Sequence, residues 1–300
     1  MIPSRYGASS TLSSIRRRKQ RSSKQSTFYR PARWLLYLCL ILGSAVTLLP
    51  FVWMLLASLK SASEILRIPP TLWPENPTLA SYRTIFSDSG LGLWRFYFNS
   101  IFVAGCSTIL VLFSSSLGGY LFAKHHFPGK DLLYGTFLIS IMLPFQIIMI
   151  PRYLLLVNFQ LVDSLWGLIL PAAVSAVGIV LMRQYVDVIP NEILDAARID
   201  GATEWTIYWR IVLPQLRSEL ATIGILFFML GWNNYLWPLI VITTPERRTL
   251  PVLFTWYSNG HSNRLDLTMA VGVLVIIPML LVYMVGQRWI IRGIAWTGSR

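Results

Sequence analysis

The sequence predicts an all-α integral membrane protein with six transmembrane helices. Of its 300 residues, 54% are apolar and only 13% are charged, and the mean hydropathy is +0.55. So few charged side chains would cover the surface of a water-soluble protein of this length poorly. The charged residues are also bunched along the chain, which leaves six long stretches with no acidic or basic residue.

Each uncharged stretch is 19 residues or longer. A helix rises 1.5 Å per residue, so about 20 apolar residues cross the roughly 30 Å hydrocarbon core of a bilayer. Prolines within these stretches, such as Pro144 and Pro171, are compatible with membrane helices because neighbouring chain satisfies the freed carbonyls. The predicted spans lie within Trp34–Leu59, Phe96–Ala123, Leu132–Pro151, Ser164–Met182, Leu220–Pro245 and Leu267–Gln287.

The distribution of basic residues predicts that both termini face the cytoplasm. With the N-terminus inside, the cytoplasmic segments carry 18 Lys and Arg residues and the outer segments carry 8, as the positive-inside rule requires. Nine of the 18 lie in residues 1–33, which we interpret as a disordered basic tail against anionic lipid rather than a nucleic-acid-binding arm. The stretch 34–59 is expected to be a retained first transmembrane helix, not a cleaved signal peptide.

No catalytic or metal site is predicted. Cys39 and Cys106 lie in separate spans, and the pair His125 and His126 has no acidic residue or cysteine at metal-ligand spacing. The chain contains no G-x-x-x-x-G-K-[ST] phosphate loop and no nucleophile elbow, so neither ATP hydrolysis nor a hydrolase is predicted. Because the predicted spans contain no ionisable group that would hold a coupling ion, any driving energy must come from outside this chain.

The segment Arg183–Glu219, between the fourth and fifth spans, predicts two short helices that meet at a glycine. Pro190 and Asn191 begin the first helix, with the acidic Glu192 in its first turn, where the helix dipole favours negative charge. Gly201 is expected to end this helix in the left-handed conformation. Composition alone is also consistent with a simple surface hairpin.

The second predicted helix carries an apolar stripe. Thr203 is its expected N-cap, and its apolar residues recur at helical spacing. We expect this stripe to lie in the membrane interface. The stripe consists of Trp205, Tyr208, Trp209 and Val212.

The same segment resembles the EAA loop of ABC importer permease subunits, whose pattern is Glu-Ala-Ala, three residues, Gly, nine residues, Ile-x-Leu-Pro. Asp195 stands where the family usually has Glu. Five other short stretches are similar to the carbohydrate importer class that handles oligosaccharides, maltodextrins and glycerol phosphate. The matching EAA residues are Asp195, Ala196, Ala197, Gly201, Ile211, Leu213 and Pro214, and the other stretches are 189–202, Asn99-Ser100, Pro144 with Gln146, 166–171 and 232–238.

The resemblance implies the type I ABC importer permease fold, with a permease domain at 95–292 and a coupling loop at 183–219. It implies that Asp195 pairs with a basic group of a cytoplasmic ATPase dimer, that Gly201 allows the turn, and that Ala196 and Ala197 permit close approach. ATP would be used by that partner, so this chain itself needs no cofactor. Further implied partners are a second homologous permease chain and an extracytoplasmic sugar-binding protein, with the complex in the bacterial inner membrane.

Polar residues in the fifth span are candidates for the substrate pathway. Amides within a membrane need partners, and a sugar offers hydroxyls to amides and CH faces to aromatic rings. Packing between helices explains the same residues equally well. The candidates are Gln146, Trp232, Asn233, Asn234, Tyr235 and Trp237.

Two further readings remain open at this stage. One is an importer for another solute, such as a peptide or an ion, and the other is a membrane enzyme or scaffold with an incidental loop match. The resemblance implies that the outer loop Glu246–Asp266 faces the binding protein, with Asn259 and Gly260 as a turn, and an ordinary loop is equally consistent with these residues.

Overall fold

The structure, a computed structural model, describes residues 34–87, 92–260 and 264–297, and every regular element in these ranges is helical. The chain divides into two units, Met1–Leu56 and Ala57–Arg300, which are described separately. In the first unit the described residues belong to one helix, Trp34–Ala57, most of whose apolar side chains are exposed and whose length suits a membrane span. The predicted tail, residues 1–33, lies outside the described residues.

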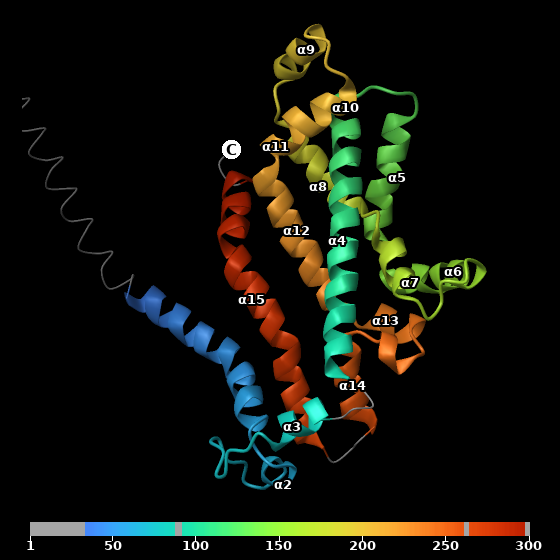
Figure 1. Cartoon of the computed structure of the whole chain (residues 1–300). Coiled ribbons are helices and arrows are strands. Elements are labelled where there is room, and N and C mark those ends of the chain that lie inside the picture. The colour runs from blue at the N-terminus through green and yellow to red at the C-terminus, as the bar shows by residue number, and fades with distance from the viewer. Residues whose placement is uncertain (1–33, 88–91, 261–263, 298–300) are drawn as a thin grey trace, which may run out of the picture. The chain divides into compact units, whose positions relative to one another are not determined.

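The second unit is a bundle of long helices joined by short ones (Figure 1). Its helices are α2 Ala62–Ile65, α3 Ala80–Ser87, α4 Leu93–Lys124, α5 Lys130–Met142, α6 Phe145–Asn158, α7 Leu165–Ile169, η1 Leu170–Ala172, α8 Ala176–Asp187, α9 Asn191–Ile199, α10 Glu204–Ile207, η2 Tyr208–Val212, α11 Leu213–Gln215, α12 Arg217–Trp232, α13 Leu236–Val241, η3 Pro245–Arg247, α14 Leu250–Gly260 and α15 Leu265–Thr297.

Three single helices of the described chain are long and apolar enough to cross a membrane, and three bent helix pairs bring the number to six if each pair is one span. The single helices are Trp34–Ala57, α4 and the Leu265–Arg288 part of α15. The bent pairs are α5 with α6, α7 and η1 with α8, and α10 to α11 with α12. The all-helical prediction is confirmed, whereas continuous helices through the third, fourth and fifth predicted spans are not observed.

The third predicted span, Leu132–Pro151, is broken at Pro144. α5 ends at Met142, α6 begins at Phe145, and the two helices meet at 109°. Proline lacks the N–H that would continue the helical ladder, and it forces the preceding residue toward an extended conformation. Leu143 has ψ 120°, as this restriction requires. The predicted span is therefore not one continuous helix, and α5 and α6 count as one span only if the bent pair crosses the membrane together.

The fifth predicted span, Leu220–Pro245, is also interrupted. α12 ends at Trp232, and Asn233 to Tyr235 separate it from α13. Pro238 has no N–H to donate to the carbonyl of Asn234, so an α-helix through this segment would lack that hydrogen bond. In the fourth span, Pro171 lies in the 3-10 turn η1, and the segment Leu165–Ala172 that contains it meets α8 at 41°.

α4 is the central helix of the second unit and packs against α8 and α12. Its contact with α8 is very close, because a Cβ added at Gly119 would lie 2.6 Å from the Cβ of Met182 and 2.8 Å from the backbone N of Arg183. Small residues permit such close packing of membrane helices, where the hydrophobic effect contributes little between apolar surfaces. Gly119 therefore sets the spacing of α4 and α8.

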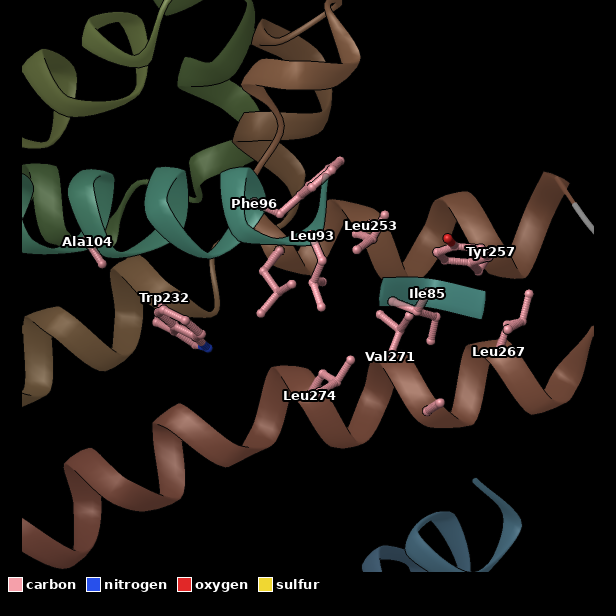
Figure 2. Close-up of a cluster of buried hydrophobic side chains, with 12 residues drawn as sticks. Ile85, Leu93, Phe96, Ala104, Trp232, Leu253, Tyr257, Leu267, Val271 and Leu274 are labelled. Carbon is pink, nitrogen blue, oxygen red and sulfur yellow. The ribbon is translucent and has the colours of Figure 1, made fainter. Parts of the chain in front are cut away.

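Buried apolar side chains gather in three clusters. Figure 2 shows the first, in which side chains from α3, α4, α12, α14 and α15 point toward one another. The second joins α4, α8, α9, α10, η2 and α12, and the third joins α4, α6, α7 and α13. In Figure 1, α9 and α10 lie at one end of the bundle and α3 and α14 at the other. The second cluster therefore supports one end of the molecule, where the predicted loop lies.

Candidate functional site

The loop at this end consists of two helices that meet at a left-handed glycine, as predicted. α9 begins directly after Pro190, and Gly201 has φ +85°. The N–H of Ala202 donates to the carbonyl of Ala197 at 2.9 Å, which satisfies a carbonyl at the helix end. The Thr203 hydroxyl accepts from the N–H of Thr206 at 3.2 Å, so the predicted N-cap of the second helix is confirmed.

The apolar stripe of the second helix is divided between two environments. Tyr208 and Val212 are fully buried in the second cluster, while Trp205 and Trp209 are about half exposed. The hydroxyl of Tyr208 lies 2.7 Å from that of Ser116 on α4. The prediction of one stripe facing the membrane interface is therefore wrong for Tyr208 and Val212, because the interior of the protein provides their partners. The segment Tyr208–Val212 is a π-helix.

The acidic residue of the EAA-like pattern lies on the surface of α9. The side chain of Asp195 is 61% exposed, and its Oδ1 accepts a hydrogen bond from Arg198 Nη1 at 2.7 Å. Leu194, the preceding residue, is 1% exposed and anchors α9 to the second cluster. Ala197 packs partly against the cluster, whereas Ala196 faces outward. The loop thus presents Asp195 and Ala196 on its outer surface.

Arg198 also contacts Glu204 on α10. Its Nε donates to Glu204 Oε1 at 2.7 Å, and Glu204 Oε2 accepts from the hydroxyl of Tyr120 at 2.6 Å. The hydrogen bond from Arg198 is the main reason that the pKa of Glu204 is lowered. The same bond, together with the one that Arg198 donates to Asp195, raises the pKa of Arg198. Arg198 and Glu204 therefore stay ionised at neutral pH.

A second contact joins α4 to the start of the loop. Lys124, the last residue of α4, donates to the carbonyl of Ile189 at 2.6 Å, to the carbonyl of Asp187 at 3.2 Å and to Asn191 Oδ1 at 3.0 Å. The ammonium thus holds the carbonyls that the end of α8 leaves free. Of the other predicted loop residues, Glu192 is exposed in the first turn of α9, and Ile211, Leu213 and Pro214 are partly buried.

The two tryptophans of the predicted substrate pathway are buried. Trp232 is 1% exposed and its Nε1 donates to the carbonyl of Val275 at 3.1 Å. Trp237 is 2% exposed and donates to the carbonyl of Gly167 at 3.2 Å. Packing within the chain therefore accounts for both indoles.

The remaining candidates lie at breaks between helices. Asn233 and Asn234 are exposed and Tyr235 is partly exposed, between α12 and α13. Asn233 Nδ2 lies 3.1 Å from the sulfur of Met279, a weak acceptor, and among the described residues the side chain of Asn234 has no hydrogen-bond partner. Gln146 is exposed next to the break at Pro144. These amides are available to a ligand or to another chain.

The end of the bundle opposite the loop is held by side chains from distant segments. Asn99 Nδ2 donates to the carbonyls of Glu246 and Arg248 at 2.9 and 3.0 Å, and the hydroxyl of Ser100 accepts from the N–H of Leu250 at 2.7 Å. These contacts explain the Asn99-Ser100 pair of the sequence pattern: Asn99 holds the segment before α14, and Ser100 holds the first residue of α14. Asn259 and Gly260 belong to α14 rather than to a turn, so that prediction was wrong.

Asp163 joins two connections at this end. Its Oδ1 accepts from the N–H groups of Thr243 and Thr244 at 2.9 and 2.8 Å, and Oδ2 lies 3.1 Å from Arg247 Nη1. Burial by itself acts to raise the pKa of Asp163, but the hydrogen bonds from Thr244 and Thr243 outweigh it, so the pKa is lowered. Asp163 thus links the α6–α7 connection to the segment after α13.

Residues 114–296 match the family described as binding-protein-dependent transport system inner membrane component. The chain belongs to this family. Its permease region therefore includes the whole EAA-like loop and the breaks on both sides of α12.

Two curated permeases illustrate how similar the relatives are. The chain is 34% identical over 282 residues to the arabinooligosaccharides transport system permease protein AraQ of Bacillus subtilis, which covers 93% of this chain and 99% of AraQ. It is 32% identical over 257 residues to the lactose transport system permease protein LacG of Rhizobium radiobacter, covering 86% of this chain and 93% of LacG.

The solved structures support the fold. A chain of a bacterial ABC transporter involved in the import of the acidic polysaccharide alginate superposes with a TM-score of 0.73, at 22% identity, over 95% of this chain and 99% of that chain. At this level of identity the similarity concerns the fold alone. The permease fold is therefore the type found in ABC importers.

Several contacts of the permease were not found from sequence. Tyr120, Lys124 and Glu204 carry no motif, although Arg198 stands at the i+3 spacing from Asp195 that favours an ion pair. Arg152 lies one residue beyond the third uncharged stretch, donates to the carbonyl of Pro171 and lies 5.2 Å from the ring of Trp237. Cys39 and Cys106 are free thiols, and no group of metal-binding side chains occurs among the described residues.

Proposed function

We propose that this permease is one of two transmembrane subunits of a carbohydrate ABC importer. It crosses the bacterial inner membrane six times with both termini in the cytoplasm, and a second, similar permease chain completes the pathway. A dimer of ATPase subunits docks on the loop of α9 and α10, and an extracytoplasmic binding protein delivers the sugar. ATP binding and hydrolysis by the ATPase subunits switch the pathway between its inward-facing and outward-facing states.

One observation carries this proposal. The residues of the EAA-like pattern form a protruding pair of helices in which Gly201 has φ +85°, Leu194 is buried, and Asp195 is exposed at the surface. Such a rigidly anchored acidic projection is suited to a socket on another protein, because its backbone is held in place before docking. The basic Lys124, which fixes the start of α9, lies at the end of a predicted span, as expected for a cytoplasmic boundary.

The proposed cargo is an uncharged oligosaccharide. The relatives named above transport arabinooligosaccharides and lactose according to their names. Exposed amides at Asn233, Asn234 and Gln146 supply neutral donors and acceptors, which suit hydroxyl groups. Other relatives, about 30% identical, are named sn-glycerol-3-phosphate permeases, which makes a phosphorylated polyol the second candidate.

Two substitutions test the coupling role. Asp195→Lys reverses the exposed charge, and Gly201→Asp places a second acidic side chain and a Cβ at the left-handed position. We expect both variants to reach the membrane in normal amounts but to lose uptake of the labelled sugar in proteoliposomes that contain all subunits. Gly201→Asn is the matched control, because asparagine tolerates this conformation and adds no charge. Normal uptake by Asp195→Lys and Gly201→Asp would reject the role.

The cargo is tested by the binding protein of the same importer. We expect isothermal titration calorimetry to detect binding of an arabinooligosaccharide or a β-galactoside and no binding of sn-glycerol 3-phosphate. Binding of the phosphate compound alone would replace the first candidate by the second.

A further inference from the structure

Arg198 is shared between two acidic side chains of the coupling loop. Its Nη1 donates to Asp195 at 2.7 Å, while its Nε and Nη2 contact the two oxygens of Glu204 at 2.7 and 3.5 Å. Arg198, Asp195 and Glu204 therefore form a cluster with one cation and two anions, and Nε2 of His125 lies 3.3 Å from Glu204 Oε2 beside it. One of the negative charges is not compensated by Arg198.

The uncompensated charge is placed on the outward side of the cluster. Glu204 has two contacts with Arg198 and accepts from Tyr120 at 2.6 Å, whereas Asp195 has one contact with Arg198. In the described part of the chain, Oδ2 of Asp195 accepts no hydrogen bond, and this side chain is the most exposed of the three, at 61%. Competition from Glu204 thus keeps Arg198 from neutralising Asp195 fully.

Glu204 is also the connection between this cluster and the bundle. Tyr120 belongs to α4 and is 2% exposed, with its ring 5.8 Å from that of Tyr208 in the second cluster. The bond from the Tyr120 hydroxyl to Glu204 joins residues that are 84 positions apart. Through Glu204, the cluster is attached to the helix that packs against both α8 and α12.

From these contacts we propose that Glu204 is a positioning residue with two effects. It binds Nε and Nη2 of Arg198 and so leaves the charge of Asp195 available to a basic group of the docking ATPase. It also transmits the position of the loop to α4 through Tyr120. This inference rests on the proposed function, because it concerns how the proposed docking is achieved.

The proposal gives docking a defined consequence within the permease. When a basic group of the ATPase binds Asp195, it competes with Arg198 for the same carboxylate. Arg198 then moves toward Glu204, and this movement changes the hydrogen bond between Glu204 and the Tyr120 hydroxyl. Because a hydrogen bond between ionised and neutral groups is short and directional, such a shift is transferred to α4 rather than lost in solvent.

The first experiment tests the electrostatic effect. Glu204→Gln keeps an acceptor for Tyr120 but releases Arg198 to Asp195, so we expect the affinity of detergent-purified permease for its ATPase subunit to fall about fivefold at low salt. This difference should largely disappear at about 1 M salt, where exposed charges are screened. Asp200→Asn is the matched control, because Asp200 is an exposed acid at the end of α9 without a side-chain partner among the described residues.

The outcomes are distinct. A loss of affinity for Glu204→Gln and not for Asp200→Asn supports the proposal. Equal losses in both variants would mean that only the net charge of the loop matters, which would overturn it, as would unchanged affinity of Glu204→Gln. If the unmodified permease retains no ATPase at all, the proposed function fails instead, before the variants are compared.

The second experiment tests the mechanical effect. Tyr120→Phe keeps the buried ring and every charge but removes the hydroxyl bond to Glu204. We expect ATPase affinity within twofold of the unmodified protein, but uptake and binding-protein-stimulated ATP hydrolysis reduced about three- to tenfold. Normal uptake by this variant would overturn the link to α4.

A double variant separates transmission from a general loss of stability. If Tyr120 acts through Glu204, the loss of stimulated hydrolysis in the double variant Tyr120→Phe with Glu204→Gln should be smaller than the product of the two single losses. Strictly multiplicative losses would show that the two residues act separately and would overturn the transmission step. Thermal unfolding of each variant provides the stability readout.

Discussion

The coupling loop and the break between α12 and α13 are both interruptions of helical structure, but they satisfy their polar groups in different ways. In the loop, Asp195, Arg198, Glu204 and Tyr120 contact one another at 2.6 to 2.7 Å. At the break, Asn233 contacts only the sulfur of Met279 within the described chain, and the side chain of Asn234 is free of protein partners there.

This difference indicates different tasks. A connected polar network fixes its members and transmits displacement, which suits a loop that is proposed to respond to another protein. Amides without internal partners lose hydrogen-bonding capacity unless water, a ligand or another chain supplies it. Under the proposed function, the loop is preformed for docking, and the break is a surface available to the proposed cargo or to the proposed second permease.

The largest effect is expected from the packing that supports the loop. Gly119→Ala places a Cβ 2.8 Å from the backbone N of Arg183, and backbone cannot move aside as a flexible side chain can. Overpacking of this kind costs about 1 to 3 kcal/mol, which corresponds to a fall in Tm of roughly 2 to 12 °C for a protein of this size. Loss of α4–α8 contact should also reduce ATPase docking, while the α12–α13 break is unaffected.

The control for this change lies in the same helix. A Cβ added at Gly105 meets no atom within 4 Å, so Gly105→Ala should leave Tm unchanged or raise it slightly through helix propensity. Thermal unfolding followed by tryptophan fluorescence measures both variants. Equal changes in Tm would show that the α4–α8 contact does not support the loop as described.

The helices of the loop could be predicted from residues that act on their own backbone, whereas the contacts of the loop with distant segments could not. Pro190, Gly201 and Thr203 each act on their own backbone, so helix starts, the left-handed turn and the N-cap follow from sequence. The bond between Tyr120 and Glu204 depends instead on how α4 and α10 pack, 84 positions apart. No spacing rule along the chain reports such a contact.

The breaks in the spans show a similar limit. Proline was visible at Pro144 and Pro238, but a proline in lipid is compatible with a straight helix, a kink or a full break. Which of these occurs depends on whether neighbouring segments satisfy the freed carbonyls and cover the turned helix. α6 is covered on one face by α13 and α7, since Leu156 and Trp237 share the third cluster. That packing is a property of the fold and not of the proline.

An intermediate effect is expected at the break. Asn234→Ala removes exposed amide groups without disturbing the core, so we expect the KM for sugar uptake to rise about fivefold, equivalent to roughly 1 kcal/mol for one hydrogen bond, with Tm unchanged. Trp237→Phe should lower Tm and leave the KM unchanged, because it removes the donor to the Gly167 carbonyl and part of a buried ring. Proteoliposome uptake and thermal unfolding distinguish them. An altered Tm with normal KM for Asn234→Ala would remove this residue from the substrate pathway.

The smallest effect is expected in the pH dependence of local stability, which should differ between Glu204, bonded to a charged donor, and Asp163, bonded mainly to neutral donors. Glu204 and Asp163 both have lowered pKa values, the first mainly through Arg198 and the second, against burial, through Thr244 and Thr243. A lowered pKa contributes stability above the unfolded-state value, about 4.3 for Glu and 3.9 for Asp, which is lost as pH falls through the folded-state value.

Salt separates these two contributions because it screens an exposed ion pair and has little effect on hydrogen bonds from neutral donors. In about 1 M salt, acid-induced loss of amide hydrogen-exchange protection in α9 and α10 should shift toward the ordinary pH range of Glu. Protection of residues 241–244 beside Asp163 should change little, and Glu204→Gln should abolish the salt-dependent part at the loop. An equal salt shift at both sites would contradict this distinction. It would mean that the ionisation of Asp163 is set by Arg247 and not by the two threonines. Arg247 Nη1 lies 3.1 Å from Asp163 Oδ2.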